Sequence, residues 1–223
     1  LKQHIEEAIR AAGGWLAFDR FMELALYTPG LGYYANGTAK FGTMPQSGSD
    51  FVTAPELSPL FGWALAQQVR EALDASGTHE VWEFGAGTGA LAKQLLDTLG
   101  SRVKRYTIVD LSGSLRARQQ QTLEKFGDQV AWADQLPEAI EGVIVGNEVL
   151  DAMPVQLVFR QGGEQDGVWN ERGVVLADDG SFAWVDKPTD LRPPIDVPGP
   201  QDYLTELQPQ GEAFIRTIAD RLK

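Results

Sequence analysis

Gly85, Gly87 and Gly89 occupy every second position directly after the apolar run Val81–Phe84. Glu83 lies inside that run, and a helix-forming sequence follows the glycines. This order predicts a β-strand, a tight turn and the start of a helix. Glycine suits such a turn because the backbone needs positive φ there and because a Cβ would obstruct a ligand lying against it. The unpaired N–H groups at a helix start favour an anionic or electron-rich ligand.

A second carboxylate, Asp110, closes the next apolar run, Tyr106–Val109. It stands about 20 residues beyond the glycine turn, where nucleotide-binding folds place an acidic residue that holds ribose hydroxyls. The glycine turn and the carboxylate together therefore predict a ligand that contains a ribose.

Two cofactors are compatible with this pattern. Gly85, Gly87 and Ala90 satisfy the dinucleotide motif G-x-G-x-x-G/A, which is a weak signal by itself. Glu83 and the three glycines instead give E-x-G-x-G-x-G, the first motif of S-adenosylmethionine (SAM) methyltransferases. A carboxylate beside the turn would repel a pyrophosphate, whereas SAM has no phosphate and carries an ammonium and a sulfonium. The residues favour SAM over NAD, and a glycine turn without a ligand is the structural alternative.

The composition limits the partners and the chemistry. A formal net charge of −12 argues against nucleic acid as the main partner, because phosphate binding needs a basic face. A basic protein substrate is compatible with this charge, and so is an acidic surface that only keeps the protein in solution. The chain has no cysteine and two histidines, which excludes a disulfide framework, a thiolate nucleophile and a Cys- or His-rich metal centre. We expect no metal site.

From residue 79 onward, short apolar runs alternate with helix-forming segments. Strands are expected at 79–84, 103–109, 129–132 and 143–147, and helices at 89–99, 114–126 and 136–141. This alternation predicts an α/β fold with a parallel sheet that helices cover on both faces. Right-handed crossovers would bring the carboxyl ends of all the strands to one edge. The polar residues expected at that edge are Glu83, Asp110, Asp134, Asn147 and Glu148.

Other segments flank this core, 78–154. The N-terminal part, 1–77, is expected to form helices at 3–12 and 18–26 and a long helix that begins at Ser58-Pro59 and ends at Gly77. Thr53 and Glu56 have the spacing of a capping box. Four short strand-like runs, 155–160, 168–171, 174–177 and 182–185, predict a β excursion at 155–187, followed by a loop and a final helix in 188–223. The long helix is expected to bury Leu60, Phe61, Ala64, Leu65, Val69, Ala72 and Leu73.

Further stretches, more specific than the glycine turn, extend along essentially the whole chain. They are Phe18–Tyr34, Asp50–Gly62, Glu83–Ala92, Asp110–Ser112 and Asn147–Val155. Together they resemble the MidA-type SAM-dependent methyltransferases. That family includes the mitochondrial arginine methyltransferase that assists assembly of respiratory complex I, and many bacterial relatives. Ser49, where the family often has glycine, and Leu150, in place of a frequent aromatic residue, are small departures.

The resemblance implies a Rossmann-like methyltransferase fold that binds SAM at the carboxyl edge of the sheet. The glycines would carry the methionine part of SAM, Glu83 would orient its ammonium, and Asp110 would accept from both ribose hydroxyls. Asp134 would contact the adenine amino group. The full set of residues expected at the cofactor is Glu83, Gly85, Gly87, Gly89, Asp110, Leu111 and Asp134.

An arginine acceptor would need carboxylates around it, because its guanidinium is always protonated and strongly delocalised. Glu148 and Asp151, three residues apart, would present two carboxylates on one helical face. Asn147 would add an amide oxygen beside them. We therefore expect these three residues to be catalytic in methylation of a protein arginine, with a complex I subunit as the candidate substrate. Helix capping with a surface ion pair is the structural alternative.

Several questions stay open at the level of sequence. The chain lacks the Gly-Gly-aliphatic strand that continues this family beyond the last helix, and it begins with Leu, so we expect a longer natural polypeptide. A non-catalytic assembly factor and a small-molecule methyltransferase are the competing functions. No apolar run is long enough to span a membrane, so we expect no membrane insertion. The compartment would be the cytoplasm for a bacterial protein or the mitochondrial matrix, and the oligomeric state is not predicted.

Overall fold

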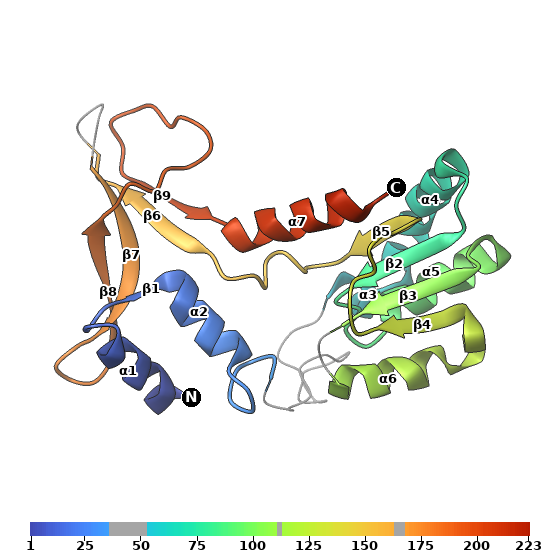
Figure 1. Ribbon diagram of the computed structural model, residues 1–223, viewed down its shortest axis with the longest axis horizontal. Helices are drawn as coiled ribbons and strands as arrows, with labels where there is room; N and C mark the ends of the chain where they lie inside the picture. The colour runs from blue at the N-terminus through green and yellow to red at the C-terminus, as the bar shows by residue number, and fades with distance from the viewer. Residues whose placement is uncertain (36–52, 111–112, 163–167) are drawn as a thin grey trace. The chain divides into compact units, whose positions relative to one another are not determined.

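Internal contacts divide the chain into two units in a computed structural model that describes residues 1–35, 53–110, 113–162 and 168–223 (Figure 1). The first unit combines Leu1–Asn36 with Leu150–Ile215, and the second combines Gly37–Val149 with Arg216–Lys223. This grouping differs from the expected N-terminal segment 1–77, because residues 53–77 belong to the unit that contains the parallel sheet.

A parallel four-stranded sheet forms the centre of the second unit, in the order β4-β3-β2-β5. Val81 of β2 pairs with Tyr106 of β3 on one side and with Val143 of β5 on the other. The apolar character of these strands suits a sheet that is buried on both faces. The expected α/β fold with a parallel sheet is confirmed. The strands are β2 (Glu80–Phe84), β3 (Arg105–Val109), β4 (Val130–Ala133) and β5 (Val143–Gly146).

Helices of the second unit pack on this sheet around one apolar core. The core gathers side chains from α4, α5, α6 and all four strands, including Val69, Leu95, Leu123 and the fully buried Ile108. The helices are α3 (Ala54–Leu57), α4 (Pro59–Ser76), α5 (Ala90–Leu99), α6 (Gly113–Leu123) and the end of α7 (Pro209–Arg221), with 3-10 turns at Gly100–Arg102 and Glu124–Gln129.

Helix α4 begins and ends as predicted, and its buried face agrees with the expected one only in part. Ser58 Oγ accepts a hydrogen bond from the Leu60 N–H at 3.2 Å, and Gly77 ends the helix with φ 68°. Leu60, expected in the core, is 65% exposed. The reason is the close approach of α4 to α5 at Gly62, where a Cβ would lie 2.3 Å from Oε1 of Gln94. The buried row therefore begins with the small residues Gly62 and Ala66 and continues through the expected Val69 and Leu73. Phe61 and Leu65 are partly buried against the core, whereas the expected Ala64 and Ala72 are exposed.

The expected helix at 136–141 does not form. Ile140 is fully buried and pairs in parallel with Leu222 just beyond α7, donating its N–H to the Arg221 carbonyl at 2.7 Å. The Arg221 guanidinium in turn donates to the carbonyls of Leu136 and Pro137 at 3.0 and 2.9 Å. Backbone groups of this segment are thus hydrogen-bonded to the end of α7, and these bonds replace those that a helix would provide.

The first unit is built on an antiparallel sheet in the order β1-β7-β6-β9. Strand β8 lies outside this order and also pairs with β7. Two expected strands, 168–171 and 174–177, are one strand, β7. It continues through Gly173, where a Cβ would lie 2.3 Å from the ring of Trp15. The elements are α1 (Lys2–Ala11), β1 (Leu16–Ala17), α2 (Phe18–Tyr27), β6 (Gln156–Arg160), β7 (Trp169–Leu176), β8 (Phe182–Pro188) and β9 (Tyr203–Leu207).

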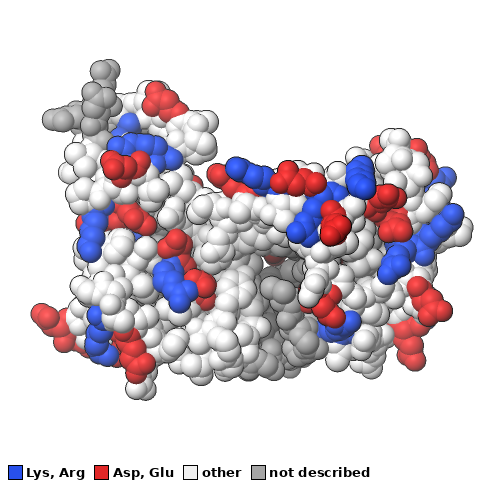
Figure 2. Space-filling model, viewed as in Figure 1, with Lys and Arg blue, Asp and Glu red and all other residues white. Residues whose placement is uncertain are grey.

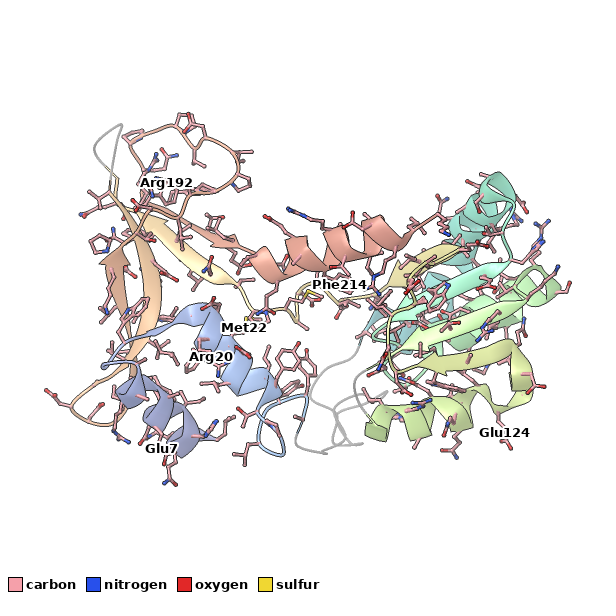
Figure 3. The ribbon with its side chains drawn as sticks, in the orientation of Figure 1. Glu7, Arg20, Met22, Glu124, Arg192 and Phe214 are labelled. Atoms are coloured by element: carbon pink, nitrogen blue, oxygen red, sulfur yellow. The ribbon has the colours of Figure 1, made fainter. Side chains whose placement is uncertain are left out.

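Strand β9 lies within the proline-containing stretch that was expected to be only a loop. The loop before it is held by Arg160, which is buried and donates through Nη2 to the Gly199 carbonyl at 2.8 Å. Arg160 and Arg192 both lie over the ring of Trp169, at 5.8 and 5.9 Å from its centroid. Figure 3 labels Arg192. Trp169 is therefore a packing residue within this unit.

Charged side chains of both signs are interspersed over the face shown in Figure 2. Ion pairs among the described residues include the exposed pair Lys93–Asp97 and the part-buried pair Arg172–Asp186, each at 2.8 Å. An exposed pair such as Lys93–Asp97 contributes only about 0–1 kcal/mol to stability. None of the helices in the described part of the chain combines the length and apolar character needed to cross a membrane.

Candidate functional site

The carboxyl edge of the parallel sheet carries the polar residues that the sequence singled out. Asp110 directly follows β3, Asp134 follows β4 and Asn147 follows β5, while Glu83 is the penultimate residue of β2. Because all neighbouring strands are parallel, these positions lie at the same edge of the sheet.

Glu83 is enclosed within the protein. It is 2% exposed, and its Oε2 accepts a hydrogen bond from the Tyr106 hydroxyl at 2.8 Å. Burial raises the pKa of Glu83 to about 7, the hydrogen bond from Tyr106 partly offsets this rise, and the charge of Asp110 adds to it. Burial and the Glu83 charge also raise the pKa of Tyr106 well above its usual value. A carboxyl group that titrates near neutral pH is a candidate partner for a cationic ligand.

The glycine turn has the backbone that its sequence predicts. Gly85, Gly87 and Gly89 have φ values of 64°, 53° and 84°, which side-chain-bearing residues rarely adopt, and α5 begins directly after them. The Gly85 N–H donates to the Val109 carbonyl at 3.2 Å, which ties the turn to the end of β3. A Cβ at Gly85 would lie 3.1 Å from Cγ2 of Val149, so the segment after β5 packs against the turn.

Gln119 of α6 connects the turn to Asp110. Its Nε2 donates to the Gly87 carbonyl at 3.0 Å and to Oδ2 of Asp110 at 2.8 Å. Its Oε1 accepts from the indole N–H of Trp132 at 2.9 Å. Reasoning from the sequence missed this residue, although Leu115, Gln119 and Leu123 share a helical row that places the glutamine on an apolar face.

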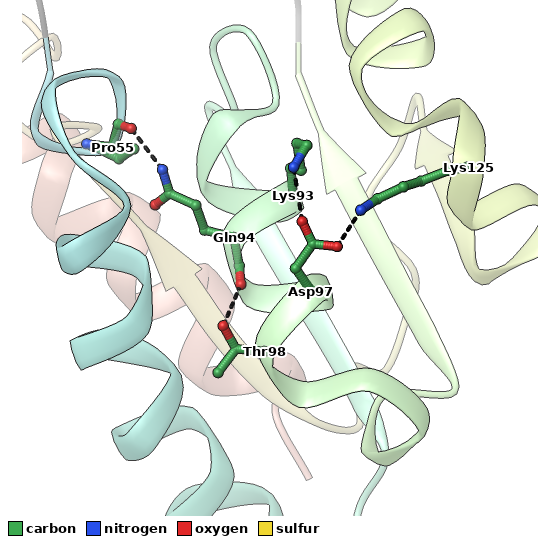
Figure 4. Close-up of polar contacts among 6 residues, drawn as sticks. All are labelled: Pro55, Lys93, Gln94, Asp97, Thr98 and Lys125. Atoms are coloured by element: carbon green, nitrogen blue, oxygen red, sulfur yellow. Dashed lines mark hydrogen bonds and ion pairs between the residues drawn. The ribbon is translucent and has the colours of Figure 1, made fainter.

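Helix α3 also contacts the turn. Thr88 donates a hydrogen bond to Oε1 of Glu56, and Gln94 of α5 donates to the Pro55 carbonyl at 2.7 Å (Figure 4). The expected capping box is wrong, because Thr53 makes no side-chain cap and Glu56 accepts from Thr88. The spacing of a capping box was present, but a buried hydroxyl in the turn provides another donor for the carboxylate.

The two remaining residues expected at the cofactor are Asp134 and Leu111. Asp134 is largely exposed, with 78% of its side chain accessible, and forms an ion pair with Arg116 of α6. Leu111 lies outside the described residues. Within the described residues, no group of three or more His, Asp or Glu side chains is arranged to hold a metal ion.

The expected acceptor residues do not share a helix. Asn147 and Glu148 follow β5 in bends of the second unit, whereas Asp151 is in a turn of the first unit. The expected presentation of Glu148 and Asp151 on one helical face is therefore wrong. Glu148 has φ 54°, which for a residue with a side chain is strained.

In the first unit, burial raises the pKa of Tyr27 to about 12, with added contributions from Tyr34 and Asp151.

The edge thus combines three positive-φ glycines, a helix start, an enclosed carboxyl group and a carboxylate fixed by Gln119. A ribose-containing ligand with a cationic group fits this set, whereas a pyrophosphate would face both Glu83 and Asp110. The fold and this edge define a Rossmann-like domain of the SAM-dependent methyltransferase class. The chain belongs to the family described as "Putative S-adenosyl-L-methionine-dependent methyltransferase", which matches residues 64–223.

Two crystal structures from Burkholderia thailandensis resemble the chain over 99% of its length. One, a "likely methyl transferase" bound to S-adenosyl-homocysteine, is 50% identical with a TM-score of 0.87, and the chain covers 59% of it. The other, an uncharacterized protein of the same superfamily, is 47% identical with a TM-score of 0.81.

Curated relatives carry more specific names. A mitochondrial protein arginine methyltransferase NDUFAF7 homolog of Caenorhabditis elegans is 26% identical over 83% of this chain. Mitochondrial NDUFAF7 of Danio rerio, also a protein arginine methyltransferase, is 31% identical over 42% of this chain. The chain spans about half of the nematode protein, 48% of its length, and 22% of the fish protein.

Proposed function

We propose that this chain binds SAM at the carboxyl edge of its parallel sheet and contributes to methyl transfer onto a protein arginine. The observation that carries the cofactor assignment is the glycine turn with Asp110 beside it, in a chain 50% identical to a structure bound to S-adenosyl-homocysteine. The family description supports the same cofactor.

The roles of the residues follow from their placement. The positive-φ glycines leave the surface of the turn free of side chains, so the methionine part of the ligand can lie against the backbone. Asp110, held on one oxygen by Gln119, accepts from the ribose hydroxyls. Glu83 balances the ligand ammonium, directly or through water, and Asp134 contacts the adenine amino group. When bound, SAM supplies an electrophilic methyl group on its sulfonium.

We further propose that the methyl acceptor is an arginine side chain of a protein. The names of the nematode and fish relatives suggest arginine, and the sequence resemblance suggests a complex I subunit as the protein that carries it. Asn147 and Glu148, at the end of β5, are the residues that we assign to the guanidinium. Their amide oxygen and carboxylate would fix its plane, because catalysis of an in-line transfer consists mainly of alignment. Asp151, which the sequence also predicts to be catalytic, is a separate candidate and is tested by its own variant.

Calorimetric titration with SAM and S-adenosylhomocysteine (SAH) tests the cofactor site. Gly87→Val should abolish binding, because the branched side chain would occupy the ligand surface of the turn. Asp110→Ala should weaken binding by about 1–3 kcal/mol, as for a lost charge-assisted hydrogen bond. Gly127→Val is a matched control, since Gly127 also has positive φ, 51°, with open space around it. Unchanged affinity in both site variants would rule the site out.

A labelling experiment tests the acceptor. The full-length protein is incubated with methyl-labelled SAM and a lysate from cells that lack its gene, and mass spectrometry then locates the label. Label on protein arginine, absent with Gly87→Val, is the expected result. Label on lysine or on a small molecule would contradict the arginine assignment while leaving the methyltransferase assignment intact.

A further inference from the structure

Gln119 is enclosed at the centre of the carboxyl edge, with 0% of its surface exposed. Its side chain bonds to Gly87 after β2, to Asp110 after β3 and to Trp132 within β4. One amide therefore links three neighbouring strands at the point where the ligand is proposed to bind.

The partners fix the orientation of this amide. The indole of Trp132 can only donate, so it must face Oε1, and the Gly87 carbonyl can only accept, so it must face the NH2 group. The remaining N–H interaction then goes to the Asp110 carboxylate, with Nε2 at 2.8 Å from Oδ2. Every polar atom of the Gln119 side chain has a partner of the correct kind, and rotating the amide would break all three bonds.

The position of α6 makes this reach possible. A Cβ added at Gly89 would lie 3.5 Å from the Cα of Gln119, so the helix backbone passes close to the third glycine of the turn. Gln119 therefore contacts the turn both through its backbone position and through its amide. The neighbouring Gln120 is exposed and makes none of these contacts.

We propose that Gln119 is a positioning residue that holds the Asp110 carboxylate and the glycine turn in the arrangement required for a ribose-containing ligand. This positioning role rests on the proposed function, in which Asp110 accepts from the ribose hydroxyls. Prior fixation of a binding carboxylate increases affinity because less rotational freedom is lost when the ligand binds. Gln119 acts through Asp110 and does not itself touch the ligand.

A double-mutant cycle on the full chain tests this role by calorimetric titration with SAH. Gln119→Met keeps the length and packing of the side chain but removes the amide, and Gln120→Met on the same helix is the matched control. We expect Gln119→Met to raise the SAH dissociation constant about tenfold, within the range for coupled neighbours, and Gln120→Met to leave it unchanged. In the Asp110→Ala background, the same Gln119→Met change should alter affinity less than about twofold.

The possible results separate the inference from the proposed function. An equal loss from Gln119→Met in both backgrounds, or no loss in either, would overturn the positioning role. A loss in Asp110→Ala with none in Gln119→Met would leave the proposed cofactor site intact and overturn only the inference. Unchanged affinity in Asp110→Ala would overturn the inference and the ribose-binding role of Asp110, and the proposed cofactor site would also fall if Gly87→Val left the affinity unchanged. If Gln119→Met does not fold, Trp132→Phe, which replaces the indole by a smaller ring and so removes the N–H that orients the amide, carries the same comparison.

Discussion

The Tyr106 hydroxyl and the Glu83 carboxyl group form a 2.8 Å hydrogen bond between neighbouring strands, and both residues are almost completely enclosed. An ionised carboxylate in such surroundings is unfavourable unless its partners compensate for the lost hydration. Here the single hydroxyl compensates only in part, since the pKa of Glu83 remains raised to about 7. The stability of the protein and its affinity for a cationic ligand should both depend on this group.

The first prediction concerns stability and pH. Because the pKa of Glu83 is raised from 4.5 to about 7 on folding, its stabilising contribution is complete below pH 4.5 and is lost as pH rises through 7. Each unit of pKa is worth about 1.4 kcal/mol, so the loss should approach roughly 3 kcal/mol. Relative to wild type, Glu83→Gln should therefore gain in free energy of unfolding between pH 5 and 8, as measured by urea titration.

Glu124→Gln serves as the control for this series. Glu124 projects from the surface beyond the end of α6 (Figure 3). Its free energy of unfolding should stay close to that of wild type throughout the series, because its side chain is exposed. If the difference in free energy of unfolding between Glu83→Gln and wild type likewise does not change between pH 5 and 8, the result would contradict a buried, neutral carboxyl group at Glu83.

The second prediction concerns ligand affinity. If ionised Glu83 balances the ligand ammonium, SAH affinity should rise roughly tenfold between pH 6 and 8 and then level off, because the ionised fraction rises by that factor around a pKa of about 7. Glu83→Gln should bind more weakly, without this pH dependence. Methylthioadenosine, which lacks the amino-acid part, is the control ligand, and its wild-type affinity should not change with pH. Equal pH profiles for the two ligands would remove Glu83 from the ammonium site.

The third prediction compares two threonines. Thr88→Val should reduce the free energy of unfolding by about 1–2 kcal/mol, because the Glu56 carboxylate loses the hydroxyl that it accepts from. Thr53→Ala should have almost no effect, since Thr53 makes no cap bond to α3. Urea unfolding of both variants distinguishes this arrangement from a capping box, for which the order of the two losses would be reversed.

The strand–turn–helix unit could be predicted from the sequence because its evidence is local. An apolar run, alternating glycines and a following carboxylate each report on their own backbone, and the structure places Gly85, Gly87 and Gly89 at positive φ. The parallel order of the strands followed from the alternation of elements, which constrains the connections.

The contacts of the candidate site could not be predicted in the same way, because they depend on which face of a helix is turned inward. Gln119, Gln120 and Gln121 are identical in type, yet only Gln119 is buried. Likewise, Leu60 seemed a better core residue than Gly62, but the close contact of α4 with α5 favours the residue without a side chain. Such choices are made by tertiary packing, which residue type alone does not report.

The backbone of Glu148 motivates the last prediction. Among the described residues, Glu148 alone combines a side chain with positive φ, 54°, and the adjacent Val149 packs against the glycine turn. Strain of this kind is retained mainly where the side chain has a function. Glu148→Gly should relieve it and increase the free energy of unfolding by about 1 kcal/mol.

If Glu148 holds the acceptor, this stabilised variant should lose methyl transfer. Glu148→Gln and Asp151→Asn, each tested alone, should keep SAH affinity nearly unchanged but slow single-turnover transfer at saturating SAM by about 2–4 kcal/mol in barrier, the range for losing one preorganised electrostatic contact. The exposed Glu124→Gln again provides the control. Because stability and transfer would change in opposite directions in Glu148→Gly, a general loss of folding could not explain the result. Wild-type transfer rates in the Glu148 and Asp151 variants would remove these residues from the acceptor site and leave the cofactor site unaffected.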